Sequence, residues 1–236
     1  MPVTIDFDSI ALDELQELLA HDDPYLRADA ACAIGDRLRT REIESLAPPV
    51  LQQVGALLAD REVAPRVEAA ITLAELHDHR ATPVLLAALR SRTFRLDAIR
   101  ALATLGDRSA VPALVLILDR FLMPWADKLQ AAAALCALGD PRGQRYLLER
   151  VHSRRFPERA ATLHFLAEAR HPAALTELCK VAADPRDSAR DVAVRALGTL
   201  RDRAALPTLD AVRHDADPEL GADVEAAIAA IAPRRR

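Results

Sequence analysis

The chain has 236 residues, of which 51% are hydrophobic, 3% aromatic and 28% charged. This composition is typical of a soluble folded protein with enough apolar side chains for a core, and it excludes disorder over most of the chain. Few glycines, few aromatics and much Ala and Leu favour helix and exclude a β-sandwich or barrel. The formal net charge of −4 gives no general attraction to DNA or to an anionic membrane.

The sequence contains no segment that predicts export or a membrane span. Its longest apolar stretch, Ala110 to Leu118, falls well short of the ~20 residues that cross a bilayer. The first residues carry neither a basic segment nor an apolar one. Cys32, Cys136 and Cys179 lie far apart in Ala-rich segments, which is typical of reduced thiols packed as small hydrophobes. We therefore expect a cytoplasmic protein that does not associate with membranes.

Two features recur along the chain and indicate a repeat. A basic residue opens each Ala-rich segment, at Arg27, Arg66, Arg95, Lys128, Arg159 and Arg190. A helix exit follows in five units, at His77-Asp78, Gly106-Asp107, Gly139-Asp140, Arg170-His171 and Arg201-Asp202. Gly supplies the left-handed conformation that ends a helix, and Asp begins the next turn. The pattern predicts pairs of helices joined by short turns.

Seven helix pairs account for nearly the whole chain. We expect the first helices at about 10–20, 46–59, 81–90, 110–119, 142–152, 172–182 and 205–214. The second helices are expected at about 24–36, 63–76, 93–105, 124–138, 157–169, 187–200 and 218–231. No linker separates two regimes of composition, so we predict a single domain over 1–236 with short flexible ends at about 1–8 and 232–236.

The segment Asp23-Pro24-Tyr25-Leu26-Arg27, with the Ala-rich helix that follows it and the Gly-Asp exits, resembles the HEAT repeat. In particular, it resembles the short HEAT-like repeats first associated with phycobilisome lyases. The resemblance implies an all-α fold, a right-handed α-solenoid of about seven HEAT-like helix pairs. It is specific for the fold and weak for function, because such repeats serve many unrelated roles.

The second helices have a buried stripe and a polar stripe. The buried stripe lies three, six and seven residues after each basic residue, and includes Ile34, Leu73, Leu102, Leu135, Phe165, Leu166 and Leu197. The polar stripe lies two, five and nine residues after it and includes Ile71, an exception to its polarity. By the resemblance, second helices line the concave surface, so the polar stripe is the expected groove.

Acidic side chains dominate the expected groove in the first units. The predicted partner-binding residues are Asp29, Asp36, Glu68, Glu75, Asp97 and Arg100. A group of negatively charged carboxylates predicts a protein partner with a basic or disordered segment. Since Arg100 and Arg195 are too few to grip a phosphate backbone, we expect no nucleic-acid partner. The alternative is an ordinary solvated helix face.

The six repeated cations form either a basic stripe or a set of structural contacts. In HEAT proteins the matching Arg usually pairs with an Asp in a turn, so the resemblance implies structural pairs here. Suitable turn residues are Asp23, Asp60, Asp119 and Asp184. Partly exposed pairs of this kind contribute about 0–1 kcal/mol each.

The middle of the chain departs most from the repeat. Its candidate apolar interface comprises Leu116, Phe121, Leu122, Met123 and Trp125. Aromatic side chains and Met are over-represented at interface cores, so this segment predicts a weak homodimer, with a monomer as the alternative. Equally, long turns need large side chains to fill the space beneath them.

Signatures of catalysis and of metal binding are absent. No His precedes a Glu, so the His-Glu pairs of the HEAT-like deoxyhypusine hydroxylases are missing, and His77 and His79 lack a third ligand. The carboxylates beside Cys32 disfavour its thiolate. The groove also lacks the basic and aromatic character of HEAT-like alkylpurine DNA glycosylases, and the tail Arg234 to Arg236 is too short to change that. We predict no catalytic, cofactor-binding or metal residues and no cofactor.

The sequence therefore predicts a non-enzymatic scaffold or adaptor that binds a protein on the concave face of a HEAT-repeat solenoid. The alternative, implied by the resemblance, is a bilin-lyase-like or chaperone-type subunit that acts on a cofactor-carrying protein.

Overall fold

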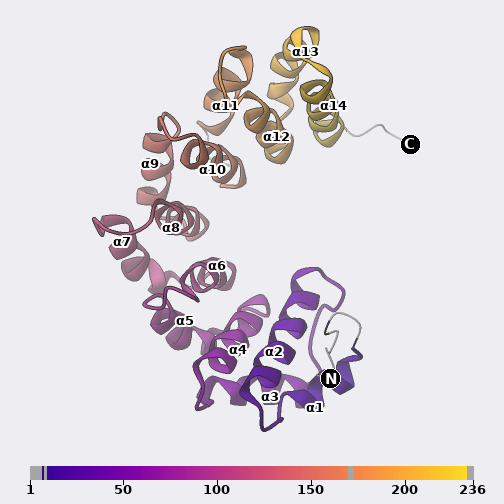
Figure 1. The fold of residues 1–236 in the computed structure, drawn as a ribbon, viewed down its shortest axis with the longest axis vertical. Coiled ribbons are helices and arrows are strands. Elements are labelled where there is room, and N and C mark those ends of the chain that lie inside the picture. The colour runs from indigo at the N-terminus through magenta and orange to yellow at the C-terminus, as the bar shows by residue number, and fades with distance from the viewer. Residues whose placement is uncertain (1–6, 8–9, 170–172, 233–236) are drawn as a thin grey trace, which may run out of the picture. The chain divides into compact units, whose positions relative to one another are not determined.

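A computed structural model describes residues 7, 10–169 and 173–232, and all regular structure in these residues is helical (Figure 1). They form two compact units, divided between Leu114 and Val115, which we describe separately. The single domain therefore stays a prediction. The exit at Arg170-His171, the Arg234 to Arg236 tail and most of both expected flexible ends lie outside the described residues. No helix among the described residues is long and apolar enough to cross a membrane.

All fourteen expected α-helices are present in the described residues, with ends within about three residues of those predicted. The first helices are α1 (Leu12–Leu18), α3 (Pro48–Ala56), α5 (Thr82–Ala88), α7 (Val111–Asp119), α9 (Pro141–Arg150), α11 (Ala174–Ala183) and α13 (Leu206–Asp215). The second helices are α2 (Pro24–Arg39), α4 (Val63–Glu75), α6 (Arg95–Leu105), α8 (Trp125–Ala137), α10 (Phe156–Glu168), α12 (Arg190–Leu200) and α14 (Pro218–Ile231). Short 3₁₀ turns η1 (Leu57–Ala59), η2 (His79–Ala81), η3 (Arg108–Ala110) and η4 (Arg203–Ala205) extend or precede several first helices.

Local sequence signals account for the helix ends. Asp23 accepts a hydrogen bond of 2.9 Å from the backbone N–H of Tyr25 and so caps the start of α2. Gly106 and Gly139 have φ of 75° and 72°, the left-handed conformation expected at the exits. His77 and Arg201 adopt the same conformation, with φ of 54° and 56°, although neither is Gly. The repeated exit is therefore a conformation that Gly favours and other residues also adopt here.

Each unit consists of two layers of helices. In the first unit α4 packs between α2 and α6, and α1, α3 and α5 each pack on the second helix that follows them. In the second unit α8, α10, α12 and α14 follow one another in one layer, and α9, α11 and α13 pack against them. This two-layer packing of successive pairs is that of an α-solenoid. The handedness of the superhelix stays a prediction.

The structure confirms the buried stripe except at Phe165. It confirms the exposure of the polar stripe except at Ile71. The aliphatic members of the buried stripe are fully buried: Ile34, Leu73, Leu102, Leu135, Leu166 and Leu197. Phe165 is only half-buried, at a position where the other repeats carry Ala or Thr. Ile71, predicted on the polar stripe, is buried on α4, which is covered by helices on both sides.

Candidate functional site

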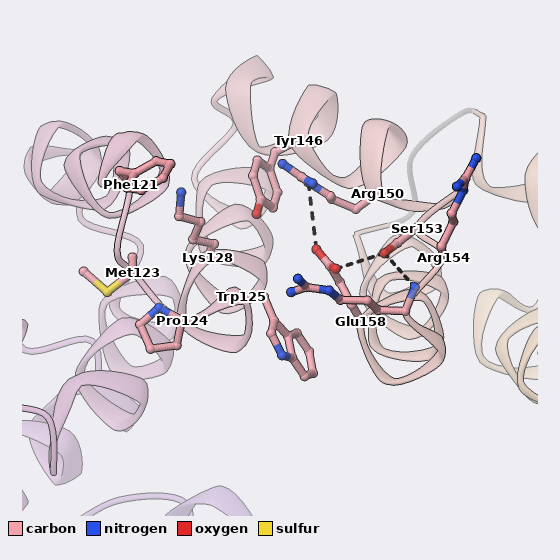
Figure 2. A pocket seen from close by; sticks show the side chains of 11 residues that line it. Phe121, Met123, Pro124, Trp125, Lys128, Tyr146, Arg150, Ser153, Arg154 and Glu158 are labelled. Atoms are coloured by element: carbon pink, nitrogen blue, oxygen red, sulfur yellow. Dashed lines mark hydrogen bonds and ion pairs between the residues drawn. The ribbon is translucent and has the colours of Figure 1, made fainter.

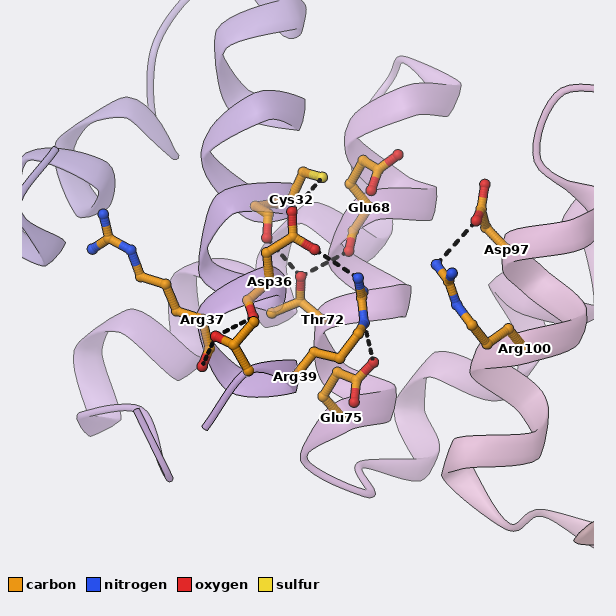
Figure 3. Close-up of polar contacts among 11 residues, drawn as sticks. Cys32, Asp36, Arg37, Arg39, Glu68, Thr72, Glu75, Asp97 and Arg100 are labelled. Carbon is orange, nitrogen blue, oxygen red and sulfur yellow. Dashed lines mark hydrogen bonds and ion pairs between the residues drawn. The ribbon is translucent and has the colours of Figure 1, made fainter. Parts of the chain in front are cut away.

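The predicted partner-binding residues lie on one helix layer of the first unit. Asp29 and Asp36 are on α2, Glu68 and Glu75 on α4, and Asp97 and Arg100 on α6. All six side chains are exposed or half-buried, and Figure 3 shows most of them side by side. We call these six residues the acidic surface.

A close approach of α2 and α4 positions the centre of the acidic surface. A Cβ atom on Gly35 would lie 2.8 Å from Oγ1 of Thr72, so only glycine allows this helix spacing without a shift. Oγ1 of Thr72 in turn lies 2.7 Å from the carbonyl oxygen of Ala31 and 2.9 Å from that of Glu68. The hydroxyl therefore ties the two helices together beneath Cys32 and Glu68 (Figure 3).

Arginines neutralise part of the acidic surface. Nη1 of Arg39 donates to Asp36 at 2.6 Å and its Nε donates to Glu75 at 3.1 Å. Arg100 donates to Asp97 at 3.0 Å. Sequence reasoning missed Arg39, because α2 was expected to end at 36 and continues to Arg39. The spacing of three residues from Asp36 is the signal that could have found it.

The middle of the acidic surface carries carboxylates without ion-pair partners. Neither Asp29 nor Glu68 lies within ion-pair distance of a cation among the described residues. Partial burial raises the pKa of Glu68, and the negative charge of Asp97 raises it further. The surface therefore crowds like charges around Glu68 in the absence of a ligand.

Cys32 lies beside Glu68 and Asp36 on this surface (Figure 3). Withdrawal of the thiol from water by surrounding protein atoms, with the charges of Glu68 and then Asp36, raises the pKa of Cys32 to about 12. The sequence indicated Asp29 and Asp36 as the carboxylates that disfavour the thiolate. Asp36 acts in this way, but the larger charge effect comes from Glu68, on the neighbouring helix. At neutral pH this thiol is a poor nucleophile.

Several of the repeated cations make structural contacts with turns. Arg27 donates from Nε and Nη2 to both oxygens of Asp60, at 2.8 and 2.9 Å. Arg159 pairs with Asp187 through both Nη atoms, and Arg190 pairs with Asp215 at 2.7 Å. The structural interpretation of these arginines is thus confirmed.

Three of the four suggested turn partners were wrong. Asp119 forms no ion pair with a repeated cation in the part of the chain that the structure describes. Asp184 does not bind a repeated cation, because its carboxylate accepts from the backbone N–H of Arg186, and Asp187 lies nearer to Arg159. Asp23 serves as the helix cap described above. Each role depends on where the carboxylate lies within its turn, which the repeat spacing does not specify.

The candidate apolar interface is largely exposed. Leu116, Phe121 and Leu122 expose 69%, 91% and 86% of their surface, whereas Met123 and Trp125 are half-buried. The alternative that these side chains fill space beneath the turn is therefore wrong for Phe121 and Leu122. The homodimer stays a prediction.

No cluster of three or more metal-ligating side chains occurs among the described residues. His77 and His79 are both exposed, and Nδ1 of His79 lies 3.5 Å from a carboxylate oxygen of Asp107. This arrangement is a turn contact in which Asp107 also accepts from the hydroxyl of Thr82 at 2.6 Å.

Three segments of the chain match a known repeat family. Residues 65–91, 94–120 and 189–212 match the PBS lyase HEAT-like repeat. Each segment begins in or just before a second helix and runs into the first helix of the next pair. No curated protein matches the sequence.

A solved structure shares the fold. A chain of the complex of CpcE and CpcF of phycocyanin lyase from Nostoc is similar, with a TM-score of 0.59, 20% identity, and 94% of this chain and 95% of that chain covered. Human deoxyhypusine hydroxylase, solved with glycerol, gives a TM-score of 0.42 and 17% identity over 93% of this chain and 95% of that chain. The chain is therefore a helical HEAT-like repeat protein, similar in its repeats to the phycobilisome-lyase type and in its fold to phycocyanin lyase.

Proposed function

We propose that the chain is a protein-binding scaffold whose acidic surface holds a basic segment of a partner protein. The observation that carries this proposal is the crowding of carboxylates around Glu68, which has no cation within ion-pair distance in the described part of the chain. A Lys or Arg side chain from a partner would relieve this repulsion and satisfy Glu68 and Asp97 together.

The spacing of the helices suits an extended segment. Packed helices lie about 8–10 Å apart, so a segment that crosses α2, α4 and α6 spans roughly 20 Å, or about six extended residues. Asp29, Glu68 and Asp97 then each face one part of such a segment. The ion pairs Arg39–Asp36 and Arg100–Asp97 are about half exposed and contribute about 0–1 kcal/mol each, so partner cations can replace the arginines at these two carboxylates.

The comparison with phycocyanin lyase supports a protein partner. The similar structure is a complex of two proteins, CpcE and CpcF. Repeat proteins commonly bind partners along one helix layer, because the repetition gives a long continuous surface.

Affinity purification from the native host tests the proposal. The bait is the full chain, compared with Glu68→Lys, Asp97→Lys and with the control Glu14→Lys, Glu17→Lys, which makes the same charge change on α1. We expect basic partners with the wild type and the control, and their loss with the first variant. Recovery of the same proteins with all three baits would contradict the proposal. Circular dichroism verifies that each bait is folded.

A second candidate function is a bilin-lyase-like or chaperone-type subunit that acts on a cofactor-carrying protein. The repeat match and the fold of phycocyanin lyase favour it. It predicts a chromophore that co-purifies with the chain, or a change in visible absorbance when a tetrapyrrole is added. A colourless chain that binds no tetrapyrrole would exclude this candidate.

A further inference from the structure

A second site lies in the second unit, away from the acidic surface in sequence. A pocket of about 580 Å³ opens between the turn before α8, helices α8 and α9, and the turn before α10 (Figure 2). Its charged lining comprises four cations and one carboxylate: Lys128, Arg150, Arg154, Arg155 and Glu158. The pocket is thus strongly positive, although the whole chain has a net charge of −4.

A comparison with the other repeats explains why these cations are not neutralised by carboxylates of the chain. Arg159 and Arg190, which open the next two second helices, are each neutralised by an Asp that follows in the chain. These are Asp187, in the turn before α12, and Asp215, the last residue of α13. Lys128 occupies the corresponding position on α8, and the corresponding turn carries Ser153, Arg154 and Arg155 in place of an Asp. Lys128 consequently has no carboxylate within ion-pair distance among the described residues.

The single carboxylate of the pocket is already occupied. Glu158 is buried, and its Oε2 accepts from the hydroxyl of Ser153 at 2.9 Å. Its Oε1 lies 4.0 Å from Nε of Arg150, whose guanidinium also stacks over the ring of Tyr146 at 5.0 Å. Glu158 therefore orients Ser153 and Arg150, and it leaves Lys128, Arg154 and Arg155 free to bind an anion.

Aromatic side chains complete the pocket. Trp125 and Tyr146 line it beside the cations, and Phe121, which is 91% exposed, forms its rim next to Leu122. In Figure 2 Arg150 lies between Lys128 and Arg154, so the cations are spread along the pocket and do not converge on one point. A ligand that satisfies this arrangement carries several separated negative charges and an apolar group.

We propose that this pocket binds an acidic peptide segment of a partner protein, with carboxylates on Lys128, Arg154 and Arg155 and an aromatic or aliphatic side chain against Trp125 and Phe121. An extended peptide presents separated carboxylates and apolar side chains together, which matches both features. A single phosphate group would use only one end of the spread cations and none of the aromatic rim.

The fluorescence of Trp125 provides a direct measurement, because Trp125 is the only tryptophan of the chain. The full chain is titrated with a short peptide that carries several Glu around one Phe, and with a control peptide that carries Lys in place of Glu. We expect a saturable change with the acidic peptide alone, weakened by added NaCl. The variant Arg154→Glu, Arg155→Glu should lose at least tenfold in affinity. The control Arg145→Glu, on an exposed part of α9 outside the pocket, should bind as the wild type does.

Other results would overturn the proposal. Equal binding of both peptides, or unchanged affinity in Arg154→Glu, Arg155→Glu, would show that the charges do not recognise the ligand. A saturable change with inorganic phosphate, an oligonucleotide or a tetrapyrrole, combined with no response to the acidic peptide, would assign the pocket to that ligand. Because Glu68→Lys, Asp97→Lys changes only the first unit, its binding of the acidic peptide should be normal, and this separates the proposal from the proposed function.

Discussion

Cys32 is the side chain whose reactivity reports most directly on the acidic surface. Since its pKa is raised to about 12, only a very small fraction is thiolate at neutral pH. We predict that iodoacetamide modifies Cys32 at least about tenfold more slowly than an unhindered cysteine peptide. Replacement of Glu68 by Gln should accelerate the reaction. Mass spectrometry measures both rates, and modification at the rate of the free peptide would contradict the raised pKa of Cys32.

Glu68 should reduce the stability of the unliganded chain at neutral pH. A carboxyl group whose pKa is higher in the folded state than in the unfolded state stabilises the fold while protonated, and this contribution is lost as the pH rises through that pKa. We therefore expect Glu68→Gln to be more stable than the wild type at pH 7, by more than the ~0.5 kcal/mol scatter of surface substitutions. The difference should disappear towards pH 4, because Glu68 is then protonated.

Urea denaturation at the two pH values makes this measurement, with Glu14→Gln on the exposed face of α1 as the control. A loss of stability in Glu68→Gln at pH 7 would show that the Glu68 carboxylate is well paired in the folded chain.

At the scale of single residues, the repeat spacing predicted most of the candidate site. It placed Asp29, Glu68 and Asp97 on one helix layer, because the helical period determines which side chains share a face. It failed where one turn more or less of helix matters, as with Arg39, and where an apolar residue such as Ile71 is covered by neighbouring helices. Both outcomes depend on tertiary packing, which spacing does not encode.

At the scale of elements, the pair of Arg27 and Asp60 joins α2 to the turn before α4 and so links successive repeats. Both side chains are largely buried, 15% and 8% exposed, and the hydrogen bond from Arg27 lowers the pKa of Asp60. Removal of the carboxylate leaves a partly buried guanidinium, so Asp60→Ala should cost about 2–3 kcal/mol at pH 7. The control Asp22→Ala, whose side chain is exposed, should lie within about 0.5 kcal/mol of the wild type.

The same pair gives a pH dependence of known sign. Because the pKa of Asp60 is lower in the folded state, its stabilisation is present above about pH 4 and is lost as the pH falls further. The cost of Asp60→Ala should therefore shrink at pH 3 in urea denaturation. If Asp60→Ala lowered the free energy of unfolding equally at both pH values, packing and not charge would stabilise this turn.

Gly143 allows α9 to approach α8 closely. A Cβ atom there would lie 2.8 Å from Cβ of Leu135 and 2.9 Å from the backbone nitrogen of Cys136, and would overlap the carbonyl oxygen of Ala132. Since backbone atoms cannot move aside easily, Gly143→Ala should cost about 1–3 kcal/mol. Gly221, in α14, has open space around it, so Gly221→Ala should gain about 0.5–1 kcal/mol through helix propensity.

The midpoints of thermal or urea unfolding of the two glycine variants, each compared with the wild type, measure these effects. Equal midpoints would show that the spacing of α8 and α9 adapts to a methyl group.

The sequence predicted the helices themselves well, because their signals are local. Pro residues in first turns, Asp caps and left-handed exits mark many of the boundaries, and the repeat extends the exits to positions such as Arg201, where no Gly is present. The turn partners of the repeated cations were less predictable. Asp187 and Asp184 are three residues apart in one turn, and only the folded backbone decides which carboxylate meets Arg159.

At the scale of the whole molecule, the net charge of −4 conceals two opposite surfaces. The acidic surface follows the repeat and could be predicted from it. The positive pocket could not, because its side chains come from two turns and three helices that the repeat does not align. The one signal in the sequence was the pair Arg154-Arg155, in a turn where most of the other repeats carry Asp.

Mapping a basic peptide onto the chain tests the central claim most directly. A Lys-rich peptide of about twelve residues is long enough to cross three helices with a margin on each side. The measurement is the change in backbone amide NMR shifts of the full chain during titration. We predict saturable changes that cluster on α2, α4 and α6 around Glu68, and their loss in Glu68→Lys, Asp97→Lys. Changes confined to α1, α3 and α5, or no saturable change, would contradict the assignment of the acidic surface as the partner-binding site.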